Sequence, residues 1–311
     1  MIETTLITER TSAQTLSFVP LSPVLGAQVH CGSLARPDEQ DFDAIRKGLL
    51  DHMVLLFRGQ DLTDPELIAF GRQLHALDNA PLGYTNNQKE REHEEMLIVS
   101  NVKEDGVPIG VLGDAEVVWH SDNSYRETPL SYSLLYAVEL PDSGGETAFA
   151  NMYMAYDNLS ADLKTRLSTL TVKHDTTYNS AGELRRGFQP ASDPITAPGP
   201  YHPLVRTHPE TGRNALYLGR RPNAYVCGLS LDESESLLNM LWAHAAQERF
   251  TWQHTWKKGD VLIWDNRCLM HHRKPFDPCA RRVLHRLQFR GDRPYHDPRA
   301  AARGSHPRAP R

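Results

Sequence analysis

The chain has 311 residues, of which 40% are hydrophobic and 23% are charged, and its formal net charge is −5. Such a composition is typical of a globular protein whose core is large enough to need no disulfides, and its acidity argues against a protein that coats nucleic acid or an anionic membrane. The unusual count is histidine, at 15, which raises the question of metal or proton chemistry.

Three helices are predicted along the chain. The first covers residues 41–52, where apolar residues recur at helical spacing. The second covers residues 64–77, with Thr63 as its N-cap. The third follows Ser230, which opens a capping box, and ends near His244.

Short apolar or alternating segments predict the strands. They lie at residues 53–57, 97–100, 131–139, 146–150, 170–174, 204–207, 215–218, 250–256, 260–264 and 282–289. Early helices followed by many short strands favour a mainly β sandwich or barrel with flanking helices over a wound parallel sheet. We expect one domain over residues 1–294 and a flexible tail over residues 295–311, which are rich in Pro, Ala and Arg.

Several features bear on where the protein works. No run of about 18 apolar residues is present to span a membrane. Residues 1–12 lack the basic start and apolar stretch of a secretion signal. The four cysteines form no Cys-x-x-Cys pair, which favours four ordinary thiols in a reducing compartment. We therefore expect a cytoplasmic protein with no membrane or nucleic-acid partner.

The first candidate site feature is the pair His120 and Asp122. Residues two apart in a strand point to the same face, so an imidazole and a carboxylate can be offered to one point. Taken alone, the pair is more typical of a polar strand end.

The second feature is a buried strand within residues 259–267 that runs into a turn and then into the histidine pair His271 and His272. A histidine from a distant strand, together with His120 and Asp122, would give two histidines and one carboxylate. This is the facial triad that holds non-haem Fe(II) and leaves coordination positions open.

The third feature is a cationic strand face. In the segment 282–290, Arg282, Arg286 and Gln288 share one face, while His285 and Leu287 lie on the other. Aligned guanidinium groups suit recognition of a carboxylate or sulfonate. A solvated strand edge is the alternative interpretation.

Together with the segments 144–147 (Gly-Gly-Glu-Thr), 202–212 and 264–267 (Trp-Asp-Asn-Arg), these motifs resemble the taurine dioxygenase/2,4-D dioxygenase (TauD/TfdA) family of Fe(II)- and 2-oxoglutarate-dependent oxygenases. The resemblance runs from about Val54 to Pro294. It implies a double-stranded β-helix, or jelly-roll, fold. It also implies an enzyme that uses Fe(II), 2-oxoglutarate and O2, and couples decarboxylation of 2-oxoglutarate to succinate and CO2 with hydroxylation, or related C–H oxidation, of a small organic substrate.

The resemblance also implies roles for particular residues. His120, Asp122 and His271 match the iron ligands, and His272 has the opposite strand parity. Thr147 and Arg282 match the residues that bind the distal carboxylate of 2-oxoglutarate.

For the prime substrate, Arg286 matches the arginine that meets the acidic group of the substrate in members acting on taurine. Those members have an asparagine where this chain has Glu116, and a carboxylate there would repel an anion, which disfavours taurine itself. Tyr84 and Asn86 lie in the segment 78–95, where the family has a substrate-covering loop. A carboxylate, a sulfonate and a biosynthetic intermediate all stay open, and relatives suggest a homo-oligomer, either a dimer or a tetramer.

Two rival interpretations assign the chain to other classes of protein. A metal-dependent, cupin-like barrel enzyme without 2-oxoglutarate would keep the triad but would have no use for Thr147 with Arg282. A non-catalytic barrel that binds a small anion would not need a complete set of iron ligands. The remaining histidines, including His202, His208 and His285, are expected to be structural.

Overall fold

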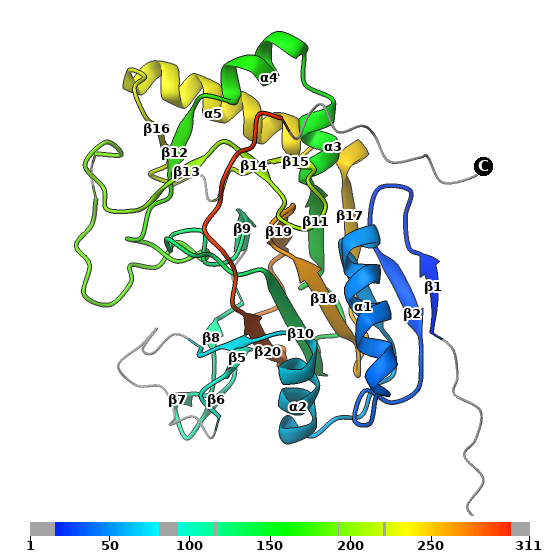
Figure 1. Ribbon diagram of the computed structural model, residues 1–311. Coiled ribbons are helices and arrows are strands. Elements are labelled where there is room, and N and C mark those ends of the chain that lie inside the picture. Colours follow the sequence, from blue (N-terminus) through cyan, green and yellow to red (C-terminus); the bar gives the residue numbers. More distant parts are fainter. Residues whose placement is uncertain (1–15, 81–92, 115–116, 192, 220–221, 300–311) are drawn as a thin grey trace, which may run out of the picture.

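The computed structural model describes residues 16–80, 93–114, 117–191, 193–219 and 222–299. Two β-sheets face each other, and helices cover the outer face of the larger sheet and one end of the molecule (Figure 1). The expectation of a mainly β fold with flanking helices is therefore confirmed.

The larger sheet has nine strands. In sheet order they are β1 (Ser17–Pro20), β2 (Ala27–His30), β3 (Val54–Phe57), β18 (Val261–Asp265), β10 (Tyr132–Glu139), β20 (Val283–Phe289), β5 (Met96–Ser100) and β8 (Val111–Leu112), with β4 (Leu77–Asp78) paired to β20. The facing sheet has the order β17 (Thr251–His254), β11 (Thr147–Asn151), β19 (Leu269–Arg273) and β9 (Val117–His120).

Short strands complete the β structure. They are β13 (Tyr201–Pro203), β12 (Thr171–Lys173) and β16 (Tyr225–Val226) in one small sheet, β14 (Val205–Thr207) with β15 (Asn214–Leu216), and β6 (Lys103–Glu104) with β7 (Val107–Pro108). The helices are α1 (Glu39–His52), α2 (Asp64–Leu74), α3 (Met152–Asp157), α4 (Ala161–Leu167), α5 (Leu231–Ala245) and the 3-10 turn Glu248–Phe250.

The larger sheet is buried on both faces, and the alternation of its side chains divides the core in two. In β3, Leu55 and Phe57 pack with Phe42 and Phe70 of α1 and α2. Leu56, between them, points the other way, into the core shared with the facing sheet. This two-sided burial explains why the central strands are almost continuously apolar.

The predicted helices form, with small differences at their ends. The first begins at Glu39 rather than residue 41. The second stops at Leu74 rather than residue 77, because His75 is extended and Leu77 begins β4. Helices α3 and α4 and strands β1 and β2 were not predicted. The alternative of a solvated edge for residues 282–290 is wrong, because β20 lies between β10 and β5.

The first part of the expected tail is bonded to β14. The backbone N–H of Thr207 donates to the carbonyl of Tyr295 (2.8 Å), and the N–H of Asp297 donates to Thr207 Oγ1 (2.8 Å). Residues 300–311 lie outside the described residues, so the boundary at residue 294 stays a prediction.

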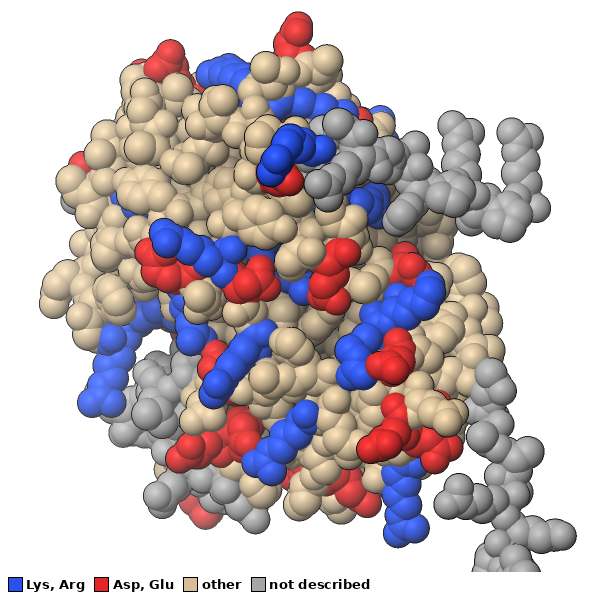
Figure 2. Space-filling view, in the orientation of Figure 1, with Lys and Arg blue, Asp and Glu red and all other residues tan. Residues whose placement is uncertain are grey.

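Charge is mixed on the face seen in Figure 2, where Lys and Arg alternate with Asp and Glu rather than forming one broad basic area. Among the described residues, none of the helices has the length and apolar character that crossing a bilayer requires.

Candidate metal centre

Two neighbouring strands bring the candidate ligands together. His271 of β19 is directly opposite His120 at the end of β9, and their rings lie 4.1 Å apart between centroids. Asp122 follows two residues later and places Oδ1 3.4 Å from His120 Nε2 and 3.7 Å from His271 Nε2. Among the described residues, these three form the one group of possible metal-binding side chains, with their ligand atoms within 4.8 Å of one another.

The protonation states suit a divalent cation. His120 Nδ1 lies 2.7 Å from the carbonyl of Val118, to which it donates, and this leaves Nε2 as the acceptor. Burial is the main cause that holds the pKa of His271 well below its ordinary value, so this ring is neutral. Burial acts to raise the pKa of Asp122, but the guanidinium of Arg286 outweighs it and helps to hold that pKa well below its ordinary value. Two imidazoles and one carboxylate form the ligand set that suits Fe(II).

A chain of hydrogen bonds orients Asp122. Ser133 Oγ donates to Asp122 Oδ2 (2.6 Å), Asn266 Nδ2 donates to Ser133 Oγ (2.9 Å), and Trp264 Nε1 donates to Asn266 Oδ1 (2.9 Å). Arg286 Nη2 forms an ion pair with the same Oδ2 at 2.6 Å. Oδ1 is therefore the oxygen that faces the histidines. Nothing in the sequence indicated Ser133. Asn266 belongs to the motif at residues 264–267, from which no role for it was predicted.

His272 lies on the other face of β19. Its ring is stacked on Trp119 with 5.4 Å between centroids, and it is half-buried. The structure thus brings His271, and not His272, to the other two ligands, as the strand parity predicted.

A buried cation, Arg282, marks the candidate 2-oxoglutarate site. Arg282 is 2% exposed, and burial together with the charge of Arg273 lowers its pKa to about 9. Its Nη2 donates to the carbonyl of Gly145 (3.2 Å), and its Nε has no hydrogen-bond partner within the described part of the chain. No described carboxylate forms an ion pair with it, so this guanidinium is suited to an anion from outside the protein, such as the distal carboxylate of 2-oxoglutarate.

Thr147 begins β11, two residues after Gly145, and is buried. Its hydroxyl oxygen accepts a hydrogen bond from the indole Nε1 of Trp256 (3.0 Å). The hydroxyl hydrogen is consequently available to a second acceptor. Trp256 is a residue that sequence reasoning missed, since nothing in its surroundings marked it.

A cavity opens beside the triad. Its lining includes His120, Asp122 and Arg286, together with Tyr125, Asn179 and Arg185. The other substrate candidates, Glu116, Tyr84 and Asn86, lie outside the described residues.

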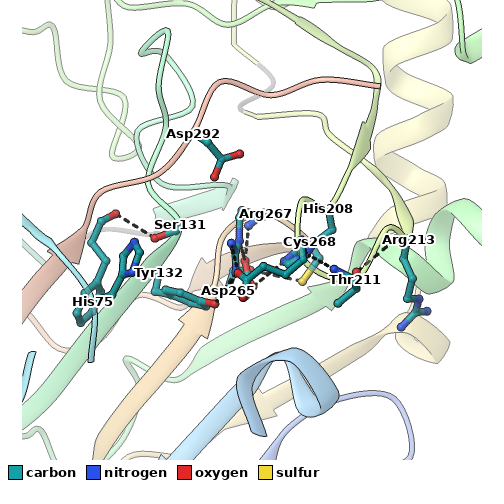
Figure 3. A network of polar contacts seen from close by, with 12 residues as sticks. His75, Ser131, Tyr132, His208, Thr211, Arg213, Asp265, Arg267, Cys268 and Asp292 are labelled. Atoms are coloured by element: carbon teal, nitrogen blue, oxygen red, sulfur yellow. Dashed lines mark hydrogen bonds and ion pairs between the residues drawn. The ribbon is translucent and has the colours of Figure 1, made fainter. Parts of the chain in front are cut away.

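Behind the site, the segment 264–267 forms a network with the segment 202–212 (Figure 3). Asp265 Oδ2 accepts from Arg267 Nη2 (2.7 Å) and lies 3.0 Å from His208 Nε2, and all three residues are buried. His202 Nε2 lies 3.0 Å from the carbonyls of Ser124 and Arg126. Both histidines have structural partners, as expected.

Comparison with known proteins agrees with this geometry. The family described as "Taurine catabolism dioxygenase TauD, TfdA family" matches residues 17–288. Pentalenolactone F synthase of Streptomyces arenae is 36% identical over 286 residues, which cover 86% of this chain and 93% of that protein. The alpha-ketoglutarate-dependent 2,4-dichlorophenoxyacetate dioxygenase of Cupriavidus pinatubonensis is 34% identical over 284 residues, which cover 86% of this chain and 95% of that protein.

Among solved structures, AAD-2 in complex with Mn(II) and N-oxalylglycine is similar, with a TM-score of 0.73 and 30% identity over 90% of this chain and 99% of that one. A putative alpha-ketoglutarate-dependent taurine dioxygenase from Burkholderia xenovorans also has a TM-score of 0.73 and 30% identity, over 90% of this chain and 94% of that one.

Proposed function

The chain belongs to the TauD/TfdA family of 2-oxoglutarate-dependent, non-haem iron dioxygenases, and we propose that it oxidises a C–H bond of a small organic carboxylate or sulfonate at the centre formed by His120, Asp122 and His271. The reaction class, with Fe(II), 2-oxoglutarate and O2, follows from the family. The site residues and the acidic substrate are our proposal.

One observation carries the assignment of the site. A buried triad of two histidines and a carboxylate lies in the same fold as a buried arginine for which the described chain supplies no counter-anion. A barrel that uses a metal without 2-oxoglutarate would have no reason to bury Arg282 in this way.

In this proposal each residue has a separate task. His120, Asp122 and His271 would hold Fe(II), while Ser133 donates to Oδ2 of Asp122 and orients its carboxylate. Bound Fe(II) supplies the oxidative chemistry that converts 2-oxoglutarate and O2 into succinate, CO2 and an oxidised substrate. Arg282 neutralises the distal carboxylate of 2-oxoglutarate, and Thr147 donates its hydroxyl hydrogen to it.

The acidic substrate is supported by two arginines of the cavity lining, Arg286 and Arg185. Relatives whose names specify 2,4-dichlorophenoxyacetate, (S)-phenoxypropionate and sulfonates act on acids of this kind. A homo-oligomer, either a dimer or a tetramer, and a cytoplasmic location stay predictions.

Adding Fe(II) and 2-oxoglutarate without oxygen is expected to produce the lilac charge-transfer band of a chelated complex. His120→Ala, Asp122→Ala and His271→Ala should each abolish the band, because each removes a ligand. His272→Ala is the matched control and should keep the band, since that ring stacks on Trp119 away from the centre. A band that survives in His271→Ala but disappears in His272→Ala would reverse the assignment.

A further inference from the structure

An indole N–H holds the hydroxyl group that the proposed function assigns to 2-oxoglutarate. Trp256 follows β17 by two residues, and its Nε1 donates to Thr147 Oγ1 (3.0 Å) at the start of the neighbouring strand β11 (Figure 1). Thr147 also lies directly opposite His254, the last residue of β17. This inference rests on the proposed function and concerns how the protein prepares the 2-oxoglutarate site.

The indole of Trp256 is itself held on both sides by one buried carboxylate. Asp260 Oδ2 accepts from the backbone N–H of Lys257, the residue after Trp256 (2.7 Å), and lies 3.1 Å from His254 Nε2. The His254 ring is nearly perpendicular to the indole, with 4.7 Å between the ring centroids. Arg58 forms an ion pair with the same oxygen of Asp260. The indole is therefore fixed before any cosubstrate binds.

The bond from the indole decides which way the Thr147 hydroxyl can act. A threonine hydroxyl has one hydrogen to donate and two lone pairs with which to accept. Because the indole N–H occupies one lone pair, the hydroxyl hydrogen must point elsewhere, and within the described part of the chain it has no acceptor. Thr147 is buried, so a donor without a partner there costs free energy that an oxygen of a ligand would recover.

The same turn carries the contact to the buried cation. Gly145 precedes Thr147 by two residues, and its carbonyl accepts from Arg282 Nη2 (3.2 Å). A carboxylate that binds Arg282 has further lone pairs, which can accept the Thr147 hydrogen. A hydroxyl that is oriented before binding loses less entropy on binding, and the hydrogen bond that it accepts strengthens the one that it donates.

We propose that Trp256 is a positioning residue for 2-oxoglutarate. Its indole N–H orients the Thr147 hydroxyl as a donor toward the distal carboxylate, and it acts through Thr147 rather than by contact with the cosubstrate. The distal carboxylate is then bound by the charge of Arg282 and by one directed donor, and Trp256 controls the second of these.

Anaerobic titration of the lilac band with 2-oxoglutarate gives the dissociation constant in the Fe(II)-loaded protein. Trp256→Phe keeps an aromatic ring but removes the N–H. It should raise this constant about threefold to tenfold, which is the range for one hydrogen bond between neutral groups. In a Thr147→Val background the same change should have an effect of less than about twofold, because the hydroxyl is already absent. In a Thr147→Ser background, which keeps a hydroxyl, the full effect should return.

Trp242→Phe is the matched control, because the buried indole Nε1 of Trp242 in α5 has no hydrogen-bond partner among the described residues. It should change the dissociation constant by less than about twofold, since no hydrogen bond is lost. The urea midpoints of the metal-free proteins show separately whether the variants are folded. If Trp256→Phe does not fold, Trp256→3-benzothienylalanine replaces the N–H by sulfur in a ring of almost the same shape, and the same increase is expected.

Three outcomes would overturn the inference while the proposed function stands. They are equal dissociation constants for the wild type and Trp256→Phe, equal effects of Trp256→Phe and Trp242→Phe, and an effect of Trp256→Phe that is the same in the Thr147→Val and Thr147→Ser backgrounds. A wild type without the band would instead overturn the proposed function.

Discussion

Gly144 and Gly145 show how single residues shape the surroundings of the buried Arg282. Both have a positive φ, 82° and 71°. A Cβ on Gly145 would lie 2.9 Å from Nε of Arg282, and a Cβ on Gly144 would lie 2.9 Å from the carbonyl oxygen of Pro275. The glycine pair therefore permits the close approach that places the start of β11 against the buried guanidinium.

Gly145→Ala is expected to raise the dissociation constant of 2-oxoglutarate about tenfold or more, because the added methyl displaces Arg282 and strains the turn. Anaerobic titration of the lilac band measures it. Gly106→Ala is the control, because Gly106 has a similar φ of 80° but nothing within 4 Å of its added Cβ. If Gly145→Ala and Gly106→Ala bind 2-oxoglutarate with equal affinity, contact between the added methyl and Arg282 does not decide that affinity.

At this scale the sequence predicted the residues that motifs identify and missed those that depend on cross-strand contact. His120, Asp122 and His271 were predicted as ligands, and the structure brings them together. Ser133 and Trp256 carried no signal, because each acts through a partner in another segment of the β structure. The register between strands decides such contacts, and it is not visible in one sequence.

The turn after β18 is the element that joins the large sheet to the segment 202–212. Burial acts to raise the pKa of Asp265, but Arg267 and His208 outweigh it and keep the carboxylate ionised. Arg267 also donates to Tyr132 Oη (2.5 Å) and to Glu210 Oε1 (2.6 Å). One guanidinium thus ties together three chain segments behind the metal centre (Figure 3).

Arg267→Leu should lower the free energy of unfolding by roughly 3–5 kcal/mol, because it leaves the buried Asp265 carboxylate without its guanidinium partner. Urea denaturation of the metal-free protein measures this loss. Arg281→Leu breaks the exposed pair with Glu139 and should cost less than about 1 kcal/mol. Losses of similar size in the two variants would contradict a structural role for the buried network.

Elements with local signals were predicted, and elements without them were not. Helices α2 and α5 have capping boxes, at Thr63 and at Ser230. Helix α3 follows β11 directly and is almost entirely buried, so it has no polar face to give a helical period. Its N-cap, Asn151, is also the last residue of the preceding strand, which hides the boundary.

Over the whole molecule, buried histidines make the stability of the folded protein depend on pH. Burial lowers the pKa of His202 and of His254, the latter despite its contact with Asp260 at 3.1 Å. In the unfolded chain these rings take up protons near pH 6.5, and in the folded protein they resist protonation until lower pH. Their contribution to stability is therefore fully present above about pH 6.5 and falls as the pH decreases.

We accordingly expect the urea midpoint of the metal-free protein to be lower at pH 5.5 than at pH 7.5. His254→Gln should show a smaller difference between the two pH values, because glutamine does not titrate. A midpoint that rises on acidification, or a pH difference that His254→Gln leaves unchanged, would contradict this account.

The pairing of His120 with His271 has a consequence for how the protein folds. These ligands lie on either side of α3, α4 and α5 in the chain, so the centre exists only after distant strands have found each other. Contacts of such long range are costly in loop-closure entropy and slow to form. A metal ion that binds the completed centre and not the unfolded chain shifts the folding equilibrium by mass action. Iron supply would then raise the fraction of the protein that is folded, in addition to its role in the reaction.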